Sequence, residues 1–426
     1  MAHRQRIPLP GTASGRCALT ALLGVLAAGS LGGCRTSSGH PGRPSADVVS
    51  TADRRIRVRL DKSIPQFVLR VEGGCLIDND EGKPLLHPLS ELDRSVVAPD
   101  PDDPSKLRVG EFRLPGPVVR VLPSEDGTLV YNDRHYRGYL VARREGNGFL
   151  VINVVDIESY LRGVLRGELP RYFHSETYRA QAIVSRTYAL YQCYVHGRKR
   201  TWDVTADTSS QVYRGRDAEA SKSNEAVAAT AGIVLAWDGP QGRKIFCTYF
   251  SSTCGGMNQN VENVKGGQAP GPLRGGVACK YCKASDWYRW DTVRLHKDRI
   301  TKDVKRFFVN GGYTHAEKLA RIEEIRVLTK TPNGRAIRLR LIDKNGFVAD
   351  MRAEDFRLLI DSGRSIKSTH FDVVTESNFI RFENGRGYGH GIGLCQHGAE
   401  GMARDGIRAG QILQHYYPGA ALVKAY

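Results

Sequence analysis

One carboxyl group stands in a position suited to acid–base chemistry: Glu168, in the stretch YLRGVLRGELP (160–170). A helix is predicted to begin after Asp156, a plausible N-cap, and to end at Gly167, a residue type common just past helix ends. Glu168 is therefore expected just beyond that helix, before the apolar Leu169. Apolar surroundings raise the pKa of a carboxyl group toward the range of a general acid. On position alone, a surface glutamate in a turn is the commoner interpretation.

Three cysteines form a second candidate centre. Cys279 and Cys282 have the Cys-x-x-Cys spacing of zinc sites, and Cys254 precedes them. With one further ligand these thiols could bind Zn²⁺. In an oxidising compartment a disulfide is an equal alternative. Spacing does not identify a fourth ligand, and the candidates are Cys247, His390 and His397.

The loop GRGYGHGIGLCQHGAEG (385–401) contains seven glycines in seventeen residues. This density allows positive φ angles and a close approach of the backbone to another group. His390 lies between two glycines, and Gln396 and His397 are expected at the start of the next helix. Amides at a helix start, together with imidazoles, suit an anionic or acetamido group. The loop matches no phosphate-binding glycine motif.

A polar stretch, TWDVTADTSSQVYRG (201–215), contains Gln211 and Tyr213 in an extended segment. Aromatic rings and amides of this kind could line a sugar groove, although a solvated loop is the simpler interpretation. The charge of the chain also predicts an anionic neighbour, because 62 Lys and Arg against 45 Asp and Glu give a formal net charge of +17. The sequence has no clustered basic run with interleaved aromatics, so we expect no nucleic-acid partner.

The N-terminal residues indicate export. Arg4, Arg6 and Arg16 precede an apolar run of signal-peptide length. The run ends in Leu-Gly-Gly-Cys34, which resembles a bacterial lipobox and implies cleavage before Cys34 and lipidation of its thiol. The alternative is an ordinary secretory signal with a chance cysteine. We expect a signal peptide over 1–33, a flexible tether over 34–52, and a membrane-anchored lipoprotein of the cell envelope.

Two regions are expected to position the candidate residues. Residues 53–150 alternate apolar with polar or basic side chains and predict a strand-rich N-terminal region. Residues 151–426 predict a mixed α/β core with a strong helix over 175–196, a helix near 296–309 and a meander near 322–350. The fold class is therefore α+β. Seven cysteines remain once Cys17 and Cys34 are set aside, and an odd number excludes a framework of disulfides alone.

Four stretches, in order, resemble the stage II sporulation protein D family, also called the amidase-enhancer domain family. They are YLRGVLRGELP (160–170), AQAIVSRTYAL (180–190), DTSSQVYRG (207–215) with STCGG (252–256), and GRGYGHGIGLCQHGA (385–399). The resemblance covers roughly 150–426, and the 53–150 region is similar only in a general way.

The resemblance implies a peptidoglycan lytic transglycosylase, because the catalytic glutamate of the family's enzymes lies in a motif that matches Glu168. Such an enzyme cleaves the bond between N-acetylmuramic acid and N-acetylglucosamine and leaves 1,6-anhydro-muramic ends. The resemblance places a glycan cleft in the core, with the glycine-rich loop opposite Glu168. The residues expected to bind the glycan are Arg186, Tyr188, Gln211, Tyr213, His390 and Gln396. The alternative is a non-catalytic wall-binding module that enhances an N-acetylmuramoyl-L-alanine amidase, which would then be a partner.

Zinc-containing members of the family have one ligand at the position of Cys254. This sequence differs from other family members at two positions that affect that site. Ser251 stands where some members have a histidine ligand, which Cys279 and Cys282 could replace. Cys395 stands where relatives often have serine, and we expect this to be a packing change.

Overall fold

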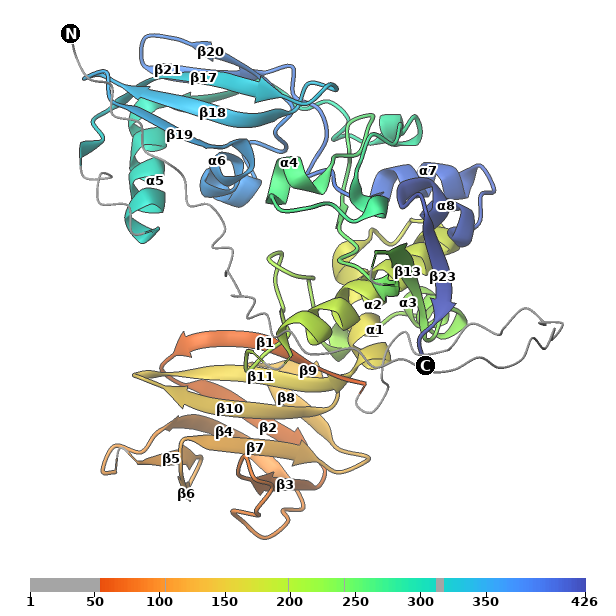
Figure 1. Ribbon diagram of the computed structural model, residues 1–426. Helices are drawn as coiled ribbons and strands as arrows, with labels where there is room; N and C mark the ends of the chain where they lie inside the picture. Colours follow the sequence, from red (N-terminus) through yellow and green to blue (C-terminus); the bar gives the residue numbers. More distant parts are fainter. Residues whose placement is uncertain (1–53, 104, 198, 241, 312–317) are drawn as a thin grey trace, which may run out of the picture.

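The computed structural model describes residues 54–426 except 104, 198, 241 and 312–317. Figure 1 shows three lobes: strands in orange and yellow, helices in the middle, and a third lobe in which helices lie beside strands. One buried apolar core joins the strand lobe to α1 (Ile157–Glu168) and to one side of α2 (Ser175–His196). A second core lies on the other side of α2, and a third belongs to the third lobe.

The strand-rich lobe consists of two six-stranded sheets, with the orders β12-β1-β11-β10-β7-β3 and β6-β5-β4-β2-β8-β9. The predicted alternation is confirmed, since the strands bury alternate side chains. β11 is buried along nearly its whole length. The strands are β1 (Arg55–Ile64), β2 (Phe67–Glu72), β3 (Cys75–Asp78), β4 (Leu92–Pro99), β5 (Lys106–Val109), β6 (Phe112–Pro115), β7 (Val118–Pro123), β8 (Thr128–Tyr131), β9 (Arg134–Tyr136), β10 (Tyr139–Glu145), β11 (Gly148–Asp156) and β12 (Val204–Thr205).

The helical lobe is closed by the C-terminal part of the chain. β23 pairs with β13, and β22 lies parallel to β15, with Phe250 opposite Leu394. The predicted helix over 175–196 is confirmed at both ends as α2. The other elements are α3 (Ser221–Ala229), β13 (Ile233–Gly239), β14 (Gly242–Ile245), β15 (Phe250–Ser251), α4 (Val261–Lys265), β22 (Leu394–Cys395), α7 (Gln396–Arg404), α8 (Ala409–Tyr416) and β23 (Ala420–Lys424).

The third lobe has two three-stranded sheets, β16-β21-β20 and β17-β18-β19, packed with α5 and α6. This lobe was not predicted as separate from the rest of the 151–426 core. The chain enters and leaves it at one place, because the Trp290 amide donates to the Gly385 carbonyl at 3.0 Å. Its elements are β16 (Val293–His296), α5 (Lys297–Asn310), β17 (Ile322–Lys330), β18 (Ala336–Asp343), β19 (Val348–Arg352), α6 (Ala353–Leu359), β20 (Asp372–Thr375) and β21 (Phe379–Glu383).

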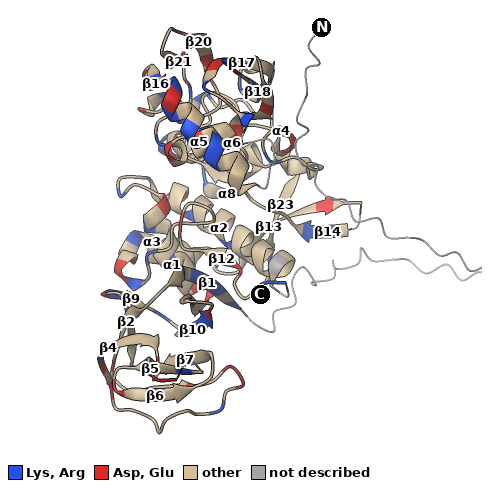
Figure 2. Ribbon diagram, turned by 90° about the vertical axis from the view of Figure 1, so that its left-hand side faces the viewer, with Lys and Arg blue, Asp and Glu red and all other residues tan. Residues whose placement is uncertain are grey.

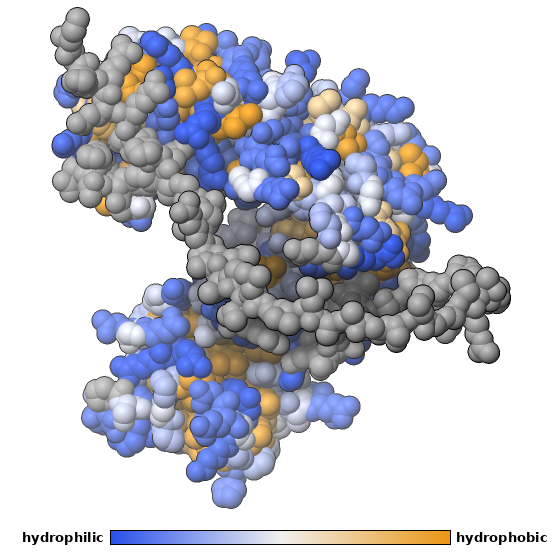
Figure 3. Space-filling view, viewed as in Figure 1, coloured by the Kyte–Doolittle hydropathy of each residue, from blue (hydrophilic) through white to orange (hydrophobic). Residues whose placement is uncertain are grey.

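The predicted α+β class is confirmed. Figure 3 shows that the surface is hollowed between the strand-rich lobe and the third lobe. Figure 2 shows basic residues on all three lobes rather than in one run. Within the part of the chain that the structure describes, no helix is long and apolar enough to cross a membrane.

Candidate active site

Glu168 is the last residue of α1, a helix that begins after the N-cap Asp156. The prediction that Gly167 terminates this helix is wrong, because Leu169 is the C-cap. Gly167 is needed for a different reason. A Cβ atom there would lie 2.4 Å from the carbonyl oxygen of Val212, so only glycine lets the 207–215 segment pack directly on the helix.

The carboxyl group of Glu168 is half-buried and accepts a hydrogen bond from the Val212 amide at 2.6 Å. Desolvation raises its pKa to about 7, and the Val212 bond and the nearby Arg214 oppose this shift only in part. A group with this pKa exists in both protonation states near neutral pH. It can therefore donate a proton in one step and accept one in the next.

The end of the glycine-rich loop is attached to Glu168. The Gln396 side-chain amide, at the start of α7, donates to the Glu168 carbonyl oxygen at 3.3 Å. The loop's glycines permit close approach to other parts of the protein: a Cβ atom on Gly393 would lie 2.1 Å from the Tyr249 carbonyl oxygen. These contacts supply a structural reason for the glycines; the expected contact with glycan stays a prediction.

His390 lies on the same loop, with its ring 5.8 Å from that of Tyr249. Its Nδ1 accepts from the Ile392 amide at 2.9 Å, which leaves the proton of the neutral ring on Nε2. Burial lowers the pKa of His390 to about 3, so the imidazole is neutral at pH 7. Tyr188 is 8% exposed, and burial raises its pKa to about 12, with a smaller contribution from Glu168.

Three of the residues predicted to bind glycan are buried, and each has at least one polar atom bonded to another group of the protein. Arg186 is fully buried and forms a bidentate ion pair with Glu158, at 2.7 and 2.8 Å. Gln211 is fully buried and accepts from the Tyr160 hydroxyl at 3.1 Å. The Tyr213 hydroxyl donates to Asn153 at 2.9 Å. We therefore leave these three side chains out of the set proposed to touch substrate.

Four buried cysteines meet at one place, and one of them lies on the glycine-rich loop: Cys254, Cys279, Cys282 and Cys395. Their sulfur atoms all lie within 4.8 Å of one another, and those of Cys254 and Cys282 are 3.7 Å apart. Four sulfurs at about 2.3 Å from a tetrahedral zinc ion would be ~3.8 Å apart. The donor set and its spacing therefore fit a metal ion bound by four thiolates.

The fourth sulfur corrects the sequence analysis, which expected Cys395 to be a packing change. None of the three candidates for the fourth ligand joins the cluster. Cys247 accepts from Gln192 at 3.7 Å, and the His397 ring packs on Phe173 at 5.1 Å. Cys395 lies more than a hundred residues after Cys282, and no spacing in the sequence marks it as the fourth member of the cluster.

Burial raises the pKa of the Cys395 thiol, and the amides and the positive charge around the cluster oppose this by favouring negatively charged sulfur. The Cys395 thiol accepts from the amides of Cys254 and Gly398, at 3.2 and 3.3 Å. Gly398 also has no room for a side chain, because a Cβ atom would lie 2.6 Å from the Cys279 sulfur. The fully buried guanidinium of Arg335 donates to the Cys254 carbonyl at 2.9 Å, which places a positive charge beside the cluster.

Comparisons with known proteins agree with this architecture. The family model described as Stage II sporulation protein matches residues 145–237, which include α1, Glu168 and α2. A model described as a domain of unknown function, DUF8618, matches residues 280–393, which include the third lobe.

Three relatives span most of the described chain. An uncharacterized protein of Brachyspira hyodysenteriae is 33% identical over 305 residues, 71% of this chain and 76% of that protein. The protein named Amidase enhancer of Bacillus subtilis is 26% identical, over 62% of this chain and 40% of that protein. Stage II sporulation protein D of Bacillus amyloliquefaciens is 26% identical, over 64% of this chain and 75% of that protein.

The α+β core, the helix ending in Glu168 and these matches define one class of protein. The chain belongs to the stage II sporulation protein D family, which includes the amidase enhancer.

Proposed function

We propose that the protein is a peptidoglycan lytic transglycosylase in which Glu168 is the general acid and then the general base. The observation that carries this proposal is the position of Glu168 at the end of α1, where desolvation raises its pKa to about 7. The family membership, with relatives named for sporulation and for enhancing an amidase, supports a role related to the cell wall.

The proposed reaction needs one carboxyl group. Protonated Glu168 donates its proton to the glycosidic oxygen between N-acetylmuramic acid and N-acetylglucosamine, and the bonding electrons leave with that oxygen. The resulting carboxylate removes the proton of the muramic C6 hydroxyl, whose oxygen bonds to C1 and closes a 1,6-anhydro ring. The proton is back on Glu168 and no water is consumed. This reaction does not need the second carboxylate that hydrolysis usually requires.

Digestion of purified peptidoglycan by the wild type and by Glu168→Gln tests the proposal. General acid–base assistance is typically worth ~10² to 10⁴ in rate, so cleavage by the variant should fall by about this factor while glycan binding persists. Wild-type products should end in 1,6-anhydro-muramic acid. Reducing muramic ends would indicate hydrolysis instead, and full activity of the variant would remove Glu168 from the chemistry.

A second candidate function follows from the relative named Amidase enhancer. In this alternative the protein binds the cell wall without cleaving glycan and enhances an N-acetylmuramoyl-L-alanine amidase. Purified wild-type protein would then release no glycan fragments, but it would raise the rate at which an amidase releases stem peptides.

We further propose that Cys254, Cys279, Cys282 and Cys395 bind one structural zinc ion. Four thiolates fill a tetrahedron, so the ion would keep no open position for water or substrate and would stabilise the fold. Metal analysis of protein purified without chelator should find about one zinc per chain. A Cys279–Cys282 or Cys254-linked disulfide found by mass spectrometry, without metal, would contradict the site.

The proposed location is the outer face of a membrane, through lipidated Cys34. This residue, with the whole signal and tether over 1–52, lies outside the described residues. Wild-type protein should fractionate with membranes, whereas Cys34→Ser should give a soluble or uncleaved form. Complete release of the wild type without detergent would contradict the anchor.

A further inference from the structure

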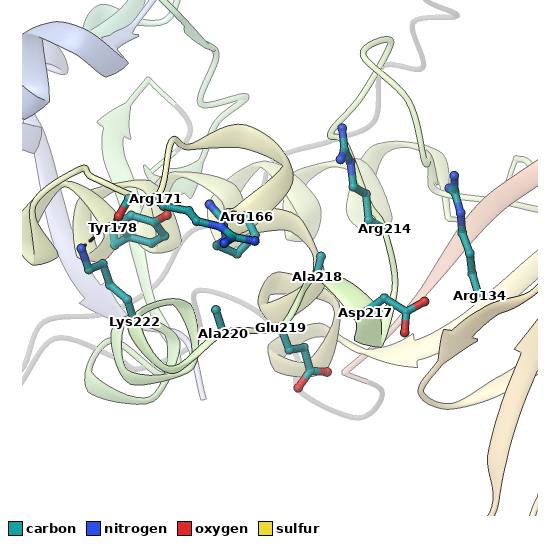
Figure 4. A pocket seen from close by; sticks show the side chains of 10 residues that line it. All are labelled: Arg134, Arg166, Arg171, Tyr178, Arg214, Asp217, Ala218, Glu219, Ala220 and Lys222. Atoms are coloured by element: carbon teal, nitrogen blue, oxygen red, sulfur yellow. Dashed lines mark hydrogen bonds between the residues drawn. The ribbon is translucent and has the colours of Figure 1, made fainter.

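A basic pocket opens beside the end of α1 (Figure 4). It has a volume of about 640 Å³, and its walls come from β9, the end of α1, the turn after it, α2, the 214–220 segment and α3. Figure 4 shows Arg166, Arg171 and Lys222 on one side and Arg134 and Arg214 on the other. Five cationic side chains therefore face one cavity.

These cations are not neutralised within the pocket. Asp217 and Glu219 also line it, but each is engaged by a residue outside the lining. Asp217 accepts from the ring and the amide of His135, at 2.8 and 3.1 Å. Glu219 forms a bidentate ion pair with Arg137, at 2.6 and 3.0 Å. The carboxylates of the pocket are thus directed to other partners.

Two of the five cations are held by neutral groups. Lys222 donates to the carbonyl oxygens of Arg171 and Phe173, at 3.1 and 2.9 Å. Arg166 donates to the Leu169 carbonyl at 3.2 Å. Among the described residues, none of the five cations forms an ion pair with a carboxylate. The positive charge of this pocket is therefore available to an anionic ligand.

The pocket adjoins the proposed reaction site. Arg166 and Arg171 flank Glu168 in the chain, on the helix end and the turn that carry it. Arg214 follows Val212, whose amide binds the Glu168 carboxyl group, and its charge acts on the pKa of Glu168. An anion held in the pocket would lie next to the bond that Glu168 is proposed to protonate.

We propose that this basic pocket binds carboxylate groups carried by the muramic acid residues of the glycan, an inference that rests on the proposed function. The sugar rings of peptidoglycan are neutral, and its negative charges are carboxylates. They belong to the lactyl group when the stem peptide is absent, or to the stem peptide when it is present. Guanidinium groups pair with carboxylates through two parallel hydrogen bonds, and four of the five cations are arginines.

Such binding would set the register of the strand. Muramic acid alternates with a neutral sugar, so only every second residue carries the group that the pocket recognises. Holding that group beside Glu168 places one of the two kinds of glycosidic bond at the carboxyl group and keeps the other away. The pocket would thus determine which bond is cut.

Binding measurements on the full chain carrying Glu168→Gln test this, because the strand is then bound without being cut. The ligands are stem-free and stem-bearing glycan strands, each also prepared with its carboxyl groups converted to methyl amides. The test variant adds Arg171→Gln and Arg214→Gln, two exposed side chains whose loss leaves the core intact. The control adds Arg306→Gln, an exposed arginine of α5 in the third lobe.

We expect the double arginine change to weaken binding of untreated strands about tenfold, at roughly threefold for each exposed ion pair. Binding of amidated strands should not change, and Arg306→Gln should change neither. The strand type that shows the effect identifies the lactyl group or the stem peptide as the source of the carboxylate. Unchanged binding, or equal weakening for untreated and amidated strands, would overturn the proposal.

Cleavage measured separately, with Glu168 in place, distinguishes failure of the carboxylate pocket from failure of the proposed transglycosylase activity. Intact cleavage without charge-selective binding would contradict the pocket alone. Charge-selective binding without any cleavage would contradict the transglycosylase and leave the carboxylate site in place on a wall-binding protein.

Discussion

The side-chain amide of Gln396 donates a hydrogen bond to the main-chain carbonyl of Glu168, 228 positions away in the sequence, at 3.3 Å. The same amide lies 3.4 Å from the side-chain oxygen of Gln181 on α2. Gln396 thus joins the glycine-rich loop to the end of α1 and to the side of α2. Because the bond is made to the main chain, Gln396 positions Glu168 without contacting its carboxyl group.

Glu168→Gln should make the stability of the protein less dependent on pH. The pKa of Glu168 is about 7 in the folded protein against 4.5 ordinarily, so the folded state binds more protons between these values. This contribution is full below the unfolded pKa and is lost as pH rises through 7. Between about pH 5 and about pH 8 we expect the wild type to lose ~1–3 kcal/mol of unfolding free energy relative to the variant. Urea unfolding at each pH measures this, and identical pH profiles would contradict the raised pKa.

Gly167→Ala should destabilise the protein by ~1–3 kcal/mol, because the new Cβ atom would meet the Val212 carbonyl at 2.4 Å. Gly410→Ala is the matched control. Gly410 also lies in a helix, but a Cβ atom there would be 3.4 Å from its nearest neighbour, so alanine should be neutral or stabilise by up to ~1 kcal/mol. Thermal unfolding of both variants gives the comparison. Equal effects would mean that the contact of α1 with the 207–215 segment can relax.

Cys395→Ser should destabilise the protein by more than ~4 kcal/mol if the four sulfurs hold a structural metal ion. It should also remove bound zinc and abolish any response of the melting temperature to a chelator. Cys193→Ser is the control, because Cys193 is a free thiol on α2 outside the cluster. A chelator response that persists in Cys395→Ser would exclude Cys395 as a ligand.

Arg335→Lys should loosen the attachment of the third lobe to the cysteine cluster. The two terminal nitrogens of the guanidinium donate to the carbonyl oxygens of Gly389 and Cys254, both at 2.9 Å. The single ammonium group of lysine cannot reproduce this pair of hydrogen bonds. We expect the free energy of unfolding to fall by ~1–3 kcal/mol and hydrogen exchange in the 385–395 segment to become faster. Arg326→Lys, at an exposed ion pair of the third lobe, should cost less than ~1 kcal/mol. Unchanged exchange in Arg335→Lys would show that the lobe is held by other contacts.

The parts of the structure that depend on local sequence were predictable. The helix over 175–196 has both its apolar period and its terminating Gly197 within one short segment. The predicted meander near 322–350 is confirmed as β17, β18 and β19, and the glycines of its two turns, Gly334 and Gly346, both have positive φ. In each case the residues that determine the structure are neighbours in the chain.

The wrong predictions concern contacts between distant segments. Gly167 resembles a helix stop, but its role depends on Val212, which no local pattern connects to it. Cys395 joins Cys254 across 141 positions, without a spacing that marks a ligand. Arg186 could equally have pointed at substrate, since only the fold shows that it pairs with Glu158.

The meeting of Trp290 with Gly385 has a consequence for how the chain assembles and how it could have evolved. Cys282 and Cys395 are separated by more than a hundred residues, and nearly all of these belong to the third lobe. A folded insertion with its ends together shortens the flexible loop that must close, which lowers the entropic penalty by about 1.5 kcal/mol relative to an unstructured chain. A domain of this form can be acquired, exchanged or lost between the first three cysteines of the cluster and the fourth, while the chain on either side keeps its path.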